Sequence, residues 1–402
     1  MGGHAVTTGT VPLGELADSF VDGPFGSDLQ VSEYVPAGIA IARIQNVRRN
    51  FFNGENLRFI TEAKAKRLQR HDYQAGDLLI TKLGEPCGLA CIVPETVETG
   101  IIVADVTRFR GKYGRVDLKY LSHFLNSPTG QREVTRRAKG TTRQRINLTS
   151  LKEIPIPLPS LQEQQRIAAI LDKADALRRK GKRTIELLDS LTQSIFLQMF
   201  GDPGTNPNGF QRGVIGELLE DTQYGTSAKA GEAGAFPILR MGNVTNDGRI
   251  VVDDLKFIDL SDKEIEKYTV RKGDILFNRT NSVDLVGKTA VFGIEEPFAF
   301  AGYLVRARTK NSISPHYVAG YLNSRHGKAT LRNMAKSIVG MANINAKEMA
   351  SISILIPDAD SQDRYTTALT SVGKQRMRLE KQLRDISSLF SSLQSRAFSG
   401  QL

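Results

Sequence analysis

Two segments of the sequence combine side chains that match the edges of nucleic-acid bases. The first is TKLGE at residues 81–85, and the second is NRTNS at residues 278–282. Lysine, arginine and asparagine offer donors and acceptors that pair with base edges in a DNA major groove, while glycine and asparagine turns let a loop project from a domain. The pattern predicts a DNA-reading loop at each segment. Its candidate contact residues are Lys82, Asn278, Arg279, Asn281 and Lys288.

A second pair of polar segments follows later in each half, TTRQRIN at residues 141–147 and GMANIN at residues 340–345. The first segment continues a basic stretch that is suited to phosphate contacts, whereas the second carries much less charge. A solvated basic surface would explain either segment alone, and their occurrence at matched places favours DNA contact. The candidates are Arg143, Gln144 and Arg145, which join Arg132, Arg136, Arg137 and Lys139 in the basic stretch.

A third matched pair is IARIQNV at residues 41–47 and ILRMGNV at residues 238–244. Packing at the end of a strand explains its polar residues as well as DNA contact does, so they are weaker candidates. A separate basic run, RRKGKR at residues 178–183, would either touch DNA or form a solvated helix face. The weaker candidates are Arg43, Gln45, Arg240 and Asn243.

The composition narrows the class of protein. The 402 residues carry a formal net charge of +11, and a basic surplus attracts polyanions, so nucleic acid becomes the leading partner class. A Walker phosphate loop, a GxGxxG loop and a GxSxG motif are absent from the sequence. The only cysteines, Cys87 and Cys91, lack a second pair that would complete a zinc site. We therefore expect a non-catalytic protein without a metal or cofactor of its own.

Two further sequence features concern location and enzyme class. No apolar run approaches the ~20 residues that a membrane helix needs, and the start MGGHAVTTGT lacks a basic-then-apolar leader, so we expect no membrane partner and a cytoplasmic location. The string TNPNGF at residues 205–210 is similar to the Asn-Pro-Pro-aromatic loop of amino-methyltransferases. However, Asn208 replaces the second proline and no glycine-rich cofactor loop precedes it. This segment is therefore predicted to be a linker.

The chain is a tandem duplication. YQAGDLLI at residues 73–80 returns as VRKGDILF at residues 270–277, and YLSHFLNS at residues 120–127 returns as YVAGYLNS at residues 317–324, both shifted by 197 positions. Five such blocks keep the same order in both halves, and the shift becomes 198 in the last block. A period this long is the size of a whole domain with an accessory element and far exceeds that of solenoid repeats.

Each repeat is predicted to have two parts. The first part alternates β-branched and aromatic runs with Gly, Pro, Asn and Asp turns, and helical spacing at residues 116–127 and 316–324 makes it a mixed α+β domain. After a proline stop, apolar residues recur every three or four positions, which predicts an amphipathic helix of roughly 35 to 40 residues. The expected caps are Ser160 and Asp358 at the helix N-termini and Gly201 and Gly400 at the C-termini.

A helix of this length with one apolar stripe needs a partner. We expect the two long helices to pair with each other, antiparallel, and to carry the two domains at opposite ends, so that the repeats are related by a pseudo-twofold axis. Two alternatives remain open at this point. Each helix would fold back onto its own domain, or its apolar stripe would serve for dimerisation.

The order domain, helix, domain, helix resembles the specificity (S) subunit of type I restriction-modification systems. The resemblance rests on GDLLITK, GDILFNRTNSVDLVGK, the IPIPLPSLQEQQRIAAIL passage into the first helix and the SIFLQMFGD end of that helix. The second helix begins with LIPDADSQDRY and lacks the glutamine-rich passage, so the repeats are unequal copies. The implied fold is α+β, with two similar target recognition domains separated by two long antiparallel coiled-coil helices. Its parts would be recognition domain 1 at residues 1–159, a central spacer helix at 160–200, a linker at 201–210, recognition domain 2 at 211–357 and a C-terminal spacer helix at 358–402.

The resemblance also implies a function. Two recognition domains would each read one half of a split site in double-stranded DNA, and the helices would set the gap between the halves. The same helices would hold two methyltransferase (M) subunits, and restriction/translocase (R) subunits would join the full complex. S-adenosylmethionine and ATP would then bind only to those partner subunits. A free-standing bipartite DNA-binding regulator and a coiled-coil scaffold remain the alternatives.

Overall fold

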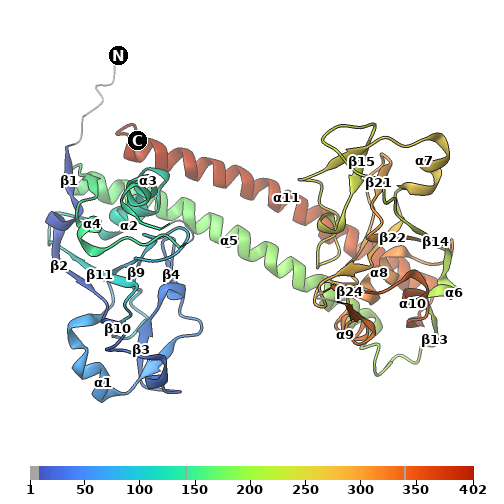
Figure 1. The fold of residues 1–402 in the computed structure, drawn as a ribbon, viewed down its shortest axis with the longest axis horizontal. Coiled ribbons are helices and arrows are strands. Elements are labelled where there is room, and N and C mark those ends of the chain that lie inside the picture. The colour runs from blue at the N-terminus through green and yellow to red at the C-terminus, as the bar shows by residue number, and fades with distance from the viewer. Residues whose placement is uncertain (1–8, 141–142, 339–340) are drawn as a thin grey trace, which may run out of the picture. The chain divides into compact units, whose positions relative to one another are not determined.

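The computed structural model describes residues 9–140, 143–338 and 341–402 (Figure 1). The chain divides into two compact units, of which unit 1 contains the residues up to 181 together with 382–402, and unit 2 contains 182–381. Each unit therefore combines one globular domain with half of each long helix. Residues 141, 142 and 340 of the predicted polar segments lie outside the described part of the chain.

The first layer of each domain is an antiparallel four-stranded sheet with the same strand order in both repeats, β2-β11-β8-β9 in unit 1 and β14-β22-β18-β20 in unit 2. The four residues of β8 and the four of β18 are all buried, because both faces of these central strands are covered. The strands are β2 (Ala17–Asp22), β8 (Leu78–Thr81), β9 (Ala90–Ile92), β11 (Val106–Gly111), β14 (Leu219–Tyr224), β18 (Ile275–Asn278), β20 (Thr289–Val291) and β22 (Leu304–Thr309).

A second four-stranded sheet lies on the side of each domain away from the long helices (Figure 1). Its order is β6-β3-β10-β7 in unit 1 and β16-β15-β21-β17 in unit 2, and in both the central pair alone is parallel. A short helix, α1 (Glu62–Arg67) or α7 (Asp262–Tyr268), connects the two outer strands. The strands are β3 (Ile39–Ala42), β6 (Arg58–Ile60), β7 (Asp72–Tyr73), β10 (Gly100–Ile102), β15 (Phe236–Leu239), β16 (Lys256–Ile258), β17 (Thr269–Val270) and β21 (Phe298–Phe300).

Smaller elements complete both domains. A two-stranded sheet closes each one by pairing its first strand with the strand before the long helix. These strands are β1 (Thr10–Pro12) with β12 (Pro155–Pro157), and β13 (Gln211–Val214) with β25 (Ser353–Ile356). The remaining strands are β4 (Val47–Arg48), β5 (Phe51–Phe52), β19 (Thr280–Asn281), β23 (Lys336–Ile338) and β24 (Met341–Asn343), and the short helical turns are η1 (Leu13–Leu16), η2 (Val31–Glu33), η3 (Ile44–Asn46), η4 (Gln69–His71), α6 (Ile215–Leu218) and η5 (Met241–Asn243).

The repeated LNS sequence ends one helix and starts the next. The hydroxyl of Ser127 accepts a hydrogen bond from Gly130 N at 3.1 Å, and Ser324 does the same for Gly327 N at 3.0 Å, so each serine is an N-cap. The helices are α2 (Leu118–Asn126), α3 (Pro128–Arg137) and α4 (Leu148–Lys152) in unit 1, and α8 (Pro315–Asn323), α9 (Arg325–Met334) and α10 (Ala346–Ala350) in unit 2.

The repeated Gly-Asp pair has a structural role. Gly76 and Gly273 adopt positive φ angles of 86° and 94°, which glycine tolerates at a tight turn. The following Asp77 is buried, and its carboxylate oxygens accept from Arg110 Nε at 2.7 Å and Nη2 at 2.9 Å. In unit 2, Asp274 accepts from Arg308 at 2.9 and 3.3 Å. The motif therefore joins the turn before the central strand to the neighbouring strand.

Two helices of 40 residues follow the domains, α5 (Leu161–Phe200) and α11 (Ala359–Phe398). Their predicted caps are confirmed, because Ser160 Oγ accepts from Glu163 N at 3.3 Å and Asp358 Oδ1 accepts from Ser361 N at 2.8 Å. At the C-terminal ends, Gly201 and Gly400 both have a φ of +74°.

The long helices pair antiparallel within each unit. In unit 1, Arg166 of α5 donates to the carbonyl of Leu402, and the Arg178 guanidinium lies 4.8 Å from the ring centroid of Phe390 on α11. In unit 2, Phe196 of α5 packs against Tyr365 of α11 with ring centroids 5.7 Å apart. The rings of Phe390, Phe196 and Tyr365 also belong to the domain cores, so pairing between helices and packing on the domains occur together. The α+β fold with two similar domains is thereby confirmed.

Candidate nucleic-acid interface

Matched main-chain hydrogen bonds hold the segment after β8 and the segment after β18. Lys82 N donates to Asp105 O at 2.7 Å, and its carbonyl accepts from Ile146 N at 2.9 Å. Arg279 N donates to Tyr303 O at 3.0 Å, and its carbonyl accepts from Ile344 N at 2.9 Å. Lys82 and Arg279 therefore occupy the same place in the two domains. At that place three chain segments meet: the central strand, the loop after β10 or β21, and the strand or bridge that precedes α4 or α10.

The two basic side chains at this place have different partners. Lys82 forms an ion pair with Asp22 at the end of β2, with Nζ 3.0 Å from Oδ1, and is largely buried. At the end of β14 the corresponding residue is Tyr224, and the Arg279 guanidinium lies 5.0 Å from the centroid of its ring. The Nε group of Arg279 is buried and finds no hydrogen-bond partner within residues 9–140, 143–338 and 341–402. Lys82 is thus paired with a carboxylate, whereas Arg279 donates from Nη1 to Gly302 O at 3.4 Å and forms no ion pair with a residue that the structure describes.

Each domain has a groove beside this place. The groove of unit 1 has a volume of about 260 Å³ and that of unit 2 about 480 Å³. Both are lined by the turn after β3 or β15 and by the loop after β10 or β21. The lining residues at matched positions are Arg43, Ile44, Gln45, Val103 and Asp105 in groove 1 and Arg240, Met241, Gly242, Ala301 and Tyr303 in groove 2.

The weaker candidates Arg43 and Arg240 lie in these grooves. Arg43 donates from Nη2 to Asn56 O at 2.8 Å, and Arg240 Nη2 lies 2.9 Å from a carboxylate oxygen of Asp254. In both residues the buried Nε group has no hydrogen-bond partner among the residues described. Asn243 is buried and instead shapes the turn, because its Oδ1 accepts from Arg240 N at 2.8 Å and its amide donates to Val251 O. Gln45 is exposed at the rim of groove 1.

The rims of the two grooves carry different residues. Arg145 is ion-paired with Asp105 at the rim of groove 1, with its side chain 56% exposed. The equivalent positions in unit 2 are Asn343, in β24, and Tyr303, which is exposed. Next to this pair, Gln144 O accepts from Gly84 N at 3.1 Å, and Arg143 is exposed. The structure therefore brings Lys82, Arg145, Arg43 and Gln45 together around the loop of residues 103–105.

Two of the three other predicted contact residues of unit 2, Asn278 and Lys288, do not project into solvent. Asn278 is 0% exposed, and its amide donates to Met241 O at 3.3 Å, so it supports the turn of η5 instead of facing a ligand. Lys288 is buried and donates to the same carbonyl at 3.2 Å. Asn281 pairs with Ala342 between β19 and β24 and is partly exposed.

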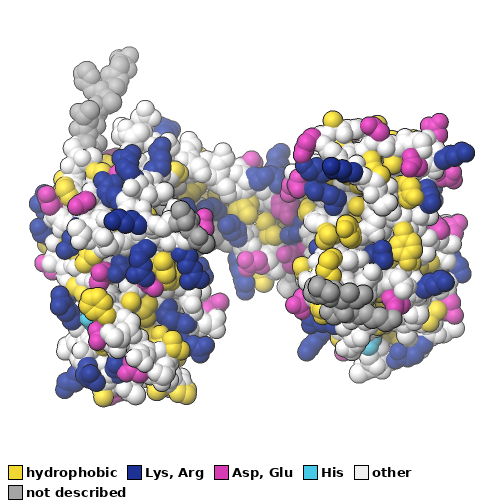
Figure 2. All heavy atoms as spheres, in the orientation of Figure 1, with side chains coloured by type: hydrophobic (Ala, Val, Ile, Leu, Met, Phe, Trp, Pro, Cys, Tyr) yellow, Lys and Arg dark blue, Asp and Glu magenta, His cyan; other side chains and the backbone are white. Residues whose placement is uncertain are grey.

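Side-chain charge is spread over the domains. Figure 2 shows Lys and Arg side chains across the visible face of each unit, with Asp and Glu between them. In the predicted basic stretch, Arg136 and Arg137 both pair with Glu133 on α3, and the Arg136 side chain is 71% exposed. Sequence reasoning missed Asp22, Asp105, Tyr224 and Tyr303 as partners and rim residues. Aligning the ends of β2 with β14 and of β10 with β21 would have identified them.

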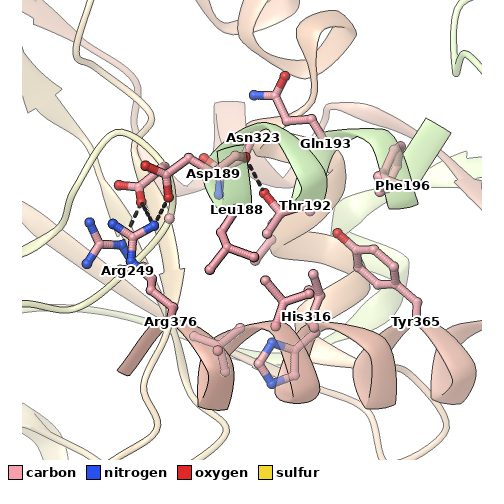
Figure 3. A pocket seen from close by; sticks show the side chains of 18 of the residues that line it. Leu188, Asp189, Thr192, Gln193, Phe196, Arg249, His316, Asn323, Tyr365 and Arg376 are labelled. Carbon is pink, nitrogen blue, oxygen red and sulfur yellow. Dashed lines mark hydrogen bonds and ion pairs between the residues drawn. The ribbon is translucent and has the colours of Figure 1, made fainter. Parts of the chain in front are cut away.

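A cavity of about 310 Å³ lies within unit 2 between its halves of α5 and α11 and helix α8 (Figure 3). Two residues that line this cavity are smaller than the residues at the equivalent positions of unit 1. Thr192 corresponds to Phe390 and Gly320 to His123, by the repeat shifts of 198 and 197. In unit 1 the rings of Phe390 and His123 fill the equivalent space, with their centroids 6.3 Å apart. His123 Nε2 also lies 2.8 Å from a carboxylate oxygen of Asp172. At one end of the cavity, Arg376 is ion-paired with Asp189 (Figure 3).

Filling this cavity is expected to stabilise unit 2. We predict that Thr192→Phe raises the free energy of unfolding by about 0.5–2 kcal/mol. The new ring would fill part of the cavity and pack against the apolar side chains that line it. Thermal and urea unfolding of the full chain would measure the gain. Thr367→Phe, at an exposed position of α11, is the matched control and should give none. Equal effects from both substitutions would contradict the interpretation.

The described residues offer neither a metal site nor a reactive thiol. In the part of the chain whose side chains are described, no group of three or more His, Cys, Asp and Glu residues is placed to hold a metal ion. Cys87 and Cys91 are buried free thiols, and burial raises the pKa of Cys91 to about 12. Among the described helices, none is both long enough and apolar enough to cross a membrane.

Comparison with known proteins gives the same two-part division. The family described as Type I restriction modification DNA specificity domain matches residues 41–187 and 211–386. The chain is 23% identical over 303 residues to the type I restriction enzyme EcoKI specificity subunit of Escherichia coli (strain K12), and 26% identical over 302 residues to the StySPI specificity subunit of Salmonella potsdam. Each match covers 70% of this chain and 65% of the relative, so the chain spans about 65% of the length of these relatives.

Solved structures share the fold. The S subunit of a type I restriction-modification system from M. genitalium matches with a TM-score of 0.60 at 16% identity, covering 97% of this chain and 95% of that one. A chain from a structure of the complex assembly and conformational transition of the type I R-M system matches with a TM-score of 0.56 at 16% identity, covering 98% of both. Because the family match takes in more than half of the sequence and occurs once in each repeat, the chain belongs to the type I restriction-modification DNA specificity family.

Proposed function

We propose that this chain is the specificity subunit of a type I restriction-modification complex and that its two domains read the two halves of a bipartite DNA site. The observation that carries the proposal is the pair of grooves 1 and 2. They share a main-chain frame and a basic residue at the matched positions of Arg43 and Arg240, yet their rims differ. A shared frame with different rim residues is suited to two different half-sites.

The rim residues indicate which base edges each groove would accept. In groove 1, the Asp105 carboxylate would accept from an exocyclic amino group, Arg145 would donate to a guanine edge, and Gln45 would match adenine. In groove 2, Arg279 supplies the forked donors, and Tyr303 adds an aromatic surface with a hydroxyl. The ion pair between Arg145 and Asp105 would open on binding, so either partner would become available to a base.

The long helices support a role in assembly. Large apolar side chains on them are exposed, which favours docking of other chains over a free-standing regulator. We propose that two methyltransferase subunits dock on these helices, that restriction subunits join the complex, and that S-adenosylmethionine and ATP bind to those partners. The helices would also set the distance between the half-sites. The exposed side chains are Leu177, Leu187, Leu191 and Leu197 on α5 and Met377 and Leu389 on α11.

Arg145→Ala is expected to relax the preference at one base pair of one half-site. The loss of a forked donor should cost about 1–3 kcal/mol of discrimination at that pair and leave the other half-site unchanged. The measurement is sequencing-based mapping of methylated adenines in cells that express the chain with its methyltransferase subunits. Arg136→Ala, an exposed arginine on α3, is the matched control and should leave the base preference as it was.

Arg279→Ala should have the corresponding effect on the opposite half-site, because Arg279 occupies the place of Lys82 in the second domain. Together the two variants assign one half-site to each domain. If neither variant changed the methylated sequence while the partner subunits were present and active, the assignment of the grooves to DNA reading would fail. A co-purification that recovered no methyltransferase subunit with the full chain would refute the assembly role.

A further inference from the structure

Three cationic side chains of unit 2 form a cluster, here called the cationic trio: Lys288, Lys328 and Arg332. Lys288 precedes β20, while Lys328 and Arg332 lie one turn apart on α9. Lys288 is 8% exposed, and Met241 O is the one acceptor of its Nζ among the described residues. The Nζ of Lys328 is buried and has no hydrogen-bond partner in the part of the chain that the structure describes. Arg332 is open to solvent, with 60% of its side chain exposed.

The positive charge of the cationic trio is poorly compensated. Arg332 lies 3.6 Å from Asp284, whose side chain is 82% exposed, and no ion pair is formed by either lysine with any residue whose side chain is described. Burial, reinforced by Lys288 and Arg332, lowers the pKa of Lys328 to about 8. Burial also lowers the pKa of Lys288. Burial of a cation without an anion costs stability, and an anion that binds beside it would recover part of that cost.

The first repeat shows that the fold does not need these cations. The equivalents of Lys288, Lys328 and Arg332 in unit 1 are Leu89, Gln131 and Thr135, which are uncharged. Gln131 Nε2 donates to Leu125 O at 2.9 Å and thereby gives this main-chain carbonyl, near the turn between α2 and α3, a hydrogen-bond partner. The packing around both sites is otherwise alike, because an added Cβ on Gly88 would meet Val134 and one on Gly287 would meet Leu331.

We propose that the cationic trio binds a phosphate group, and that its phosphate is one of the DNA backbone beside groove 2. Arg332 would contact the phosphate oxygens directly, since its guanidinium is exposed and forked. The ammonium groups of Lys288 and Lys328 would stay buried and would attract the phosphate by their positive charge without contacting it. The site adjoins groove 2 because Lys288 is bonded to the carbonyl of Met241, and Met241 lines that groove.

This inference rests on the proposed function and adds an asymmetry to it. A phosphate contact fixes the position of a domain on DNA without reading the sequence. Only the second domain carries the cationic trio, since the equivalent residues of the first are uncharged. The second domain would therefore make a phosphate contact at this place that the first domain lacks, and this contact would add to the salt dependence of its DNA binding.

The first repeat supplies the test substitutions. Arg332→Thr and Lys328→Gln place the unit 1 residue at each position, where the same fold accepts it. Binding of the full chain, assembled with its methyltransferase subunits, would be measured on a duplex that carries its site over a range of salt concentrations. Arg332→Thr should weaken binding about tenfold and reduce the slope of log affinity against log salt by about 0.9, the value for one lost phosphate contact. The methylated sequence should stay the same.

Two further measurements sharpen the test. Asp284→Ala removes the carboxylate that competes for Arg332, so it should strengthen DNA binding several-fold. The wild-type affinity should fall as the pH rises from 7 to 9.5, because Lys328 loses its proton near pH 8 in the free protein and must regain it when a phosphate arrives. Lys328→Gln should remove this part of the pH dependence. Circular dichroism would verify that each variant is folded.

The possible outcomes separate this inference from the proposed function. If Arg332→Thr leaves affinity and salt slope unchanged while Arg279→Ala alters the methylated sequence, the phosphate site is refuted and the DNA-reading role stands. If no variant affects DNA, both fail. Inorganic phosphate, added at constant ionic strength, tests for a site for the free ion. Stabilisation of the wild type by inorganic phosphate, together with unaltered DNA binding in Arg332→Thr, would overturn the assignment to DNA.

Discussion

Phe390→Ala is expected to lower the free energy of unfolding of unit 1 by about 3–5 kcal/mol, the cost of truncating a buried phenylalanine. Its ring packs at 6.3 Å from His123 of α2 and at 4.8 Å from the Arg178 guanidinium of α5. The substitution thus removes a contact between α11 and the domain as well as one between the two long helices. Urea unfolding of the full chain, with hydrogen exchange assigning the change to peptides of α2 and α5, would measure it.

The neighbouring residue provides the control. Leu389 lies on the same turn of α11 but is 56% exposed, so Leu389→Ala should change stability by no more than about 0.5 kcal/mol. A comparable loss in both variants would mean that the helix propensity of α11, and not the packing of Phe390, sets the stability of unit 1. Faster exchange confined to unit 2 would also contradict the prediction.

Asp274→Ala is expected to destabilise unit 2 by about 3–5 kcal/mol, because it breaks a buried ion pair by removing one partner. The carboxylate of Asp274 accepts from Arg308 on β22 and also from Arg271 N at 2.9 Å. Without it, the guanidinium on β22 loses its partner and the turn before β18 loses its cap. Asp274→Asn keeps the shape and one acceptor, so it should cost less than Asp274→Ala.

Because the chain is duplicated, the same prediction can be tested at the equivalent aspartate of unit 1. Asp77→Ala should cause a loss of similar size in unit 1, where Arg110 occupies the place of Arg308. Glu296→Ala, at an exposed position, is the control and should be close to neutral. If Asp274→Ala were also neutral, the buried pair would have no net effect on stability, and the Gly-Asp motif would be explained by its glycine alone.

Features set by neighbouring residues were predictable from the sequence. The duplication, the long helices and their caps at Ser160 and Asp358 depend on periodicity and on side chains within three positions of the backbone groups they bind. The grooves depend on pairs that are distant in the chain. Lys82 meets Asp22, and Arg279 meets Tyr224, only after β2 and β14 have joined their sheets.

The same limit explains the predicted residues that lie inside the domain. Asn278 and Lys288 have types that suit a base edge, but both donate to Met241 O, a carbonyl that lies 37 residues before Asn278 and 47 residues before Lys288 in the chain. Residue type identifies what a side chain can bond, while burial decides which partner it meets. The cavity of unit 2 was hidden for a similar reason. The repeat shifts match Thr192 with Phe390 and Gly320 with His123, but the contact between the two rings of unit 1 forms only when the helices that carry them have packed together.

The state of the two cysteines makes the chain convenient for site-specific chemistry. Cys87 and Cys91 are buried, and burial raises the pKa of both thiols, so at neutral pH almost none of either is the reactive thiolate. A maleimide or a disulfide-forming DNA probe would therefore find little background on the wild-type protein. A single cysteine introduced at an exposed rim position such as Gln45 would then report by cross-linking which base pair of the duplex lies against groove 1.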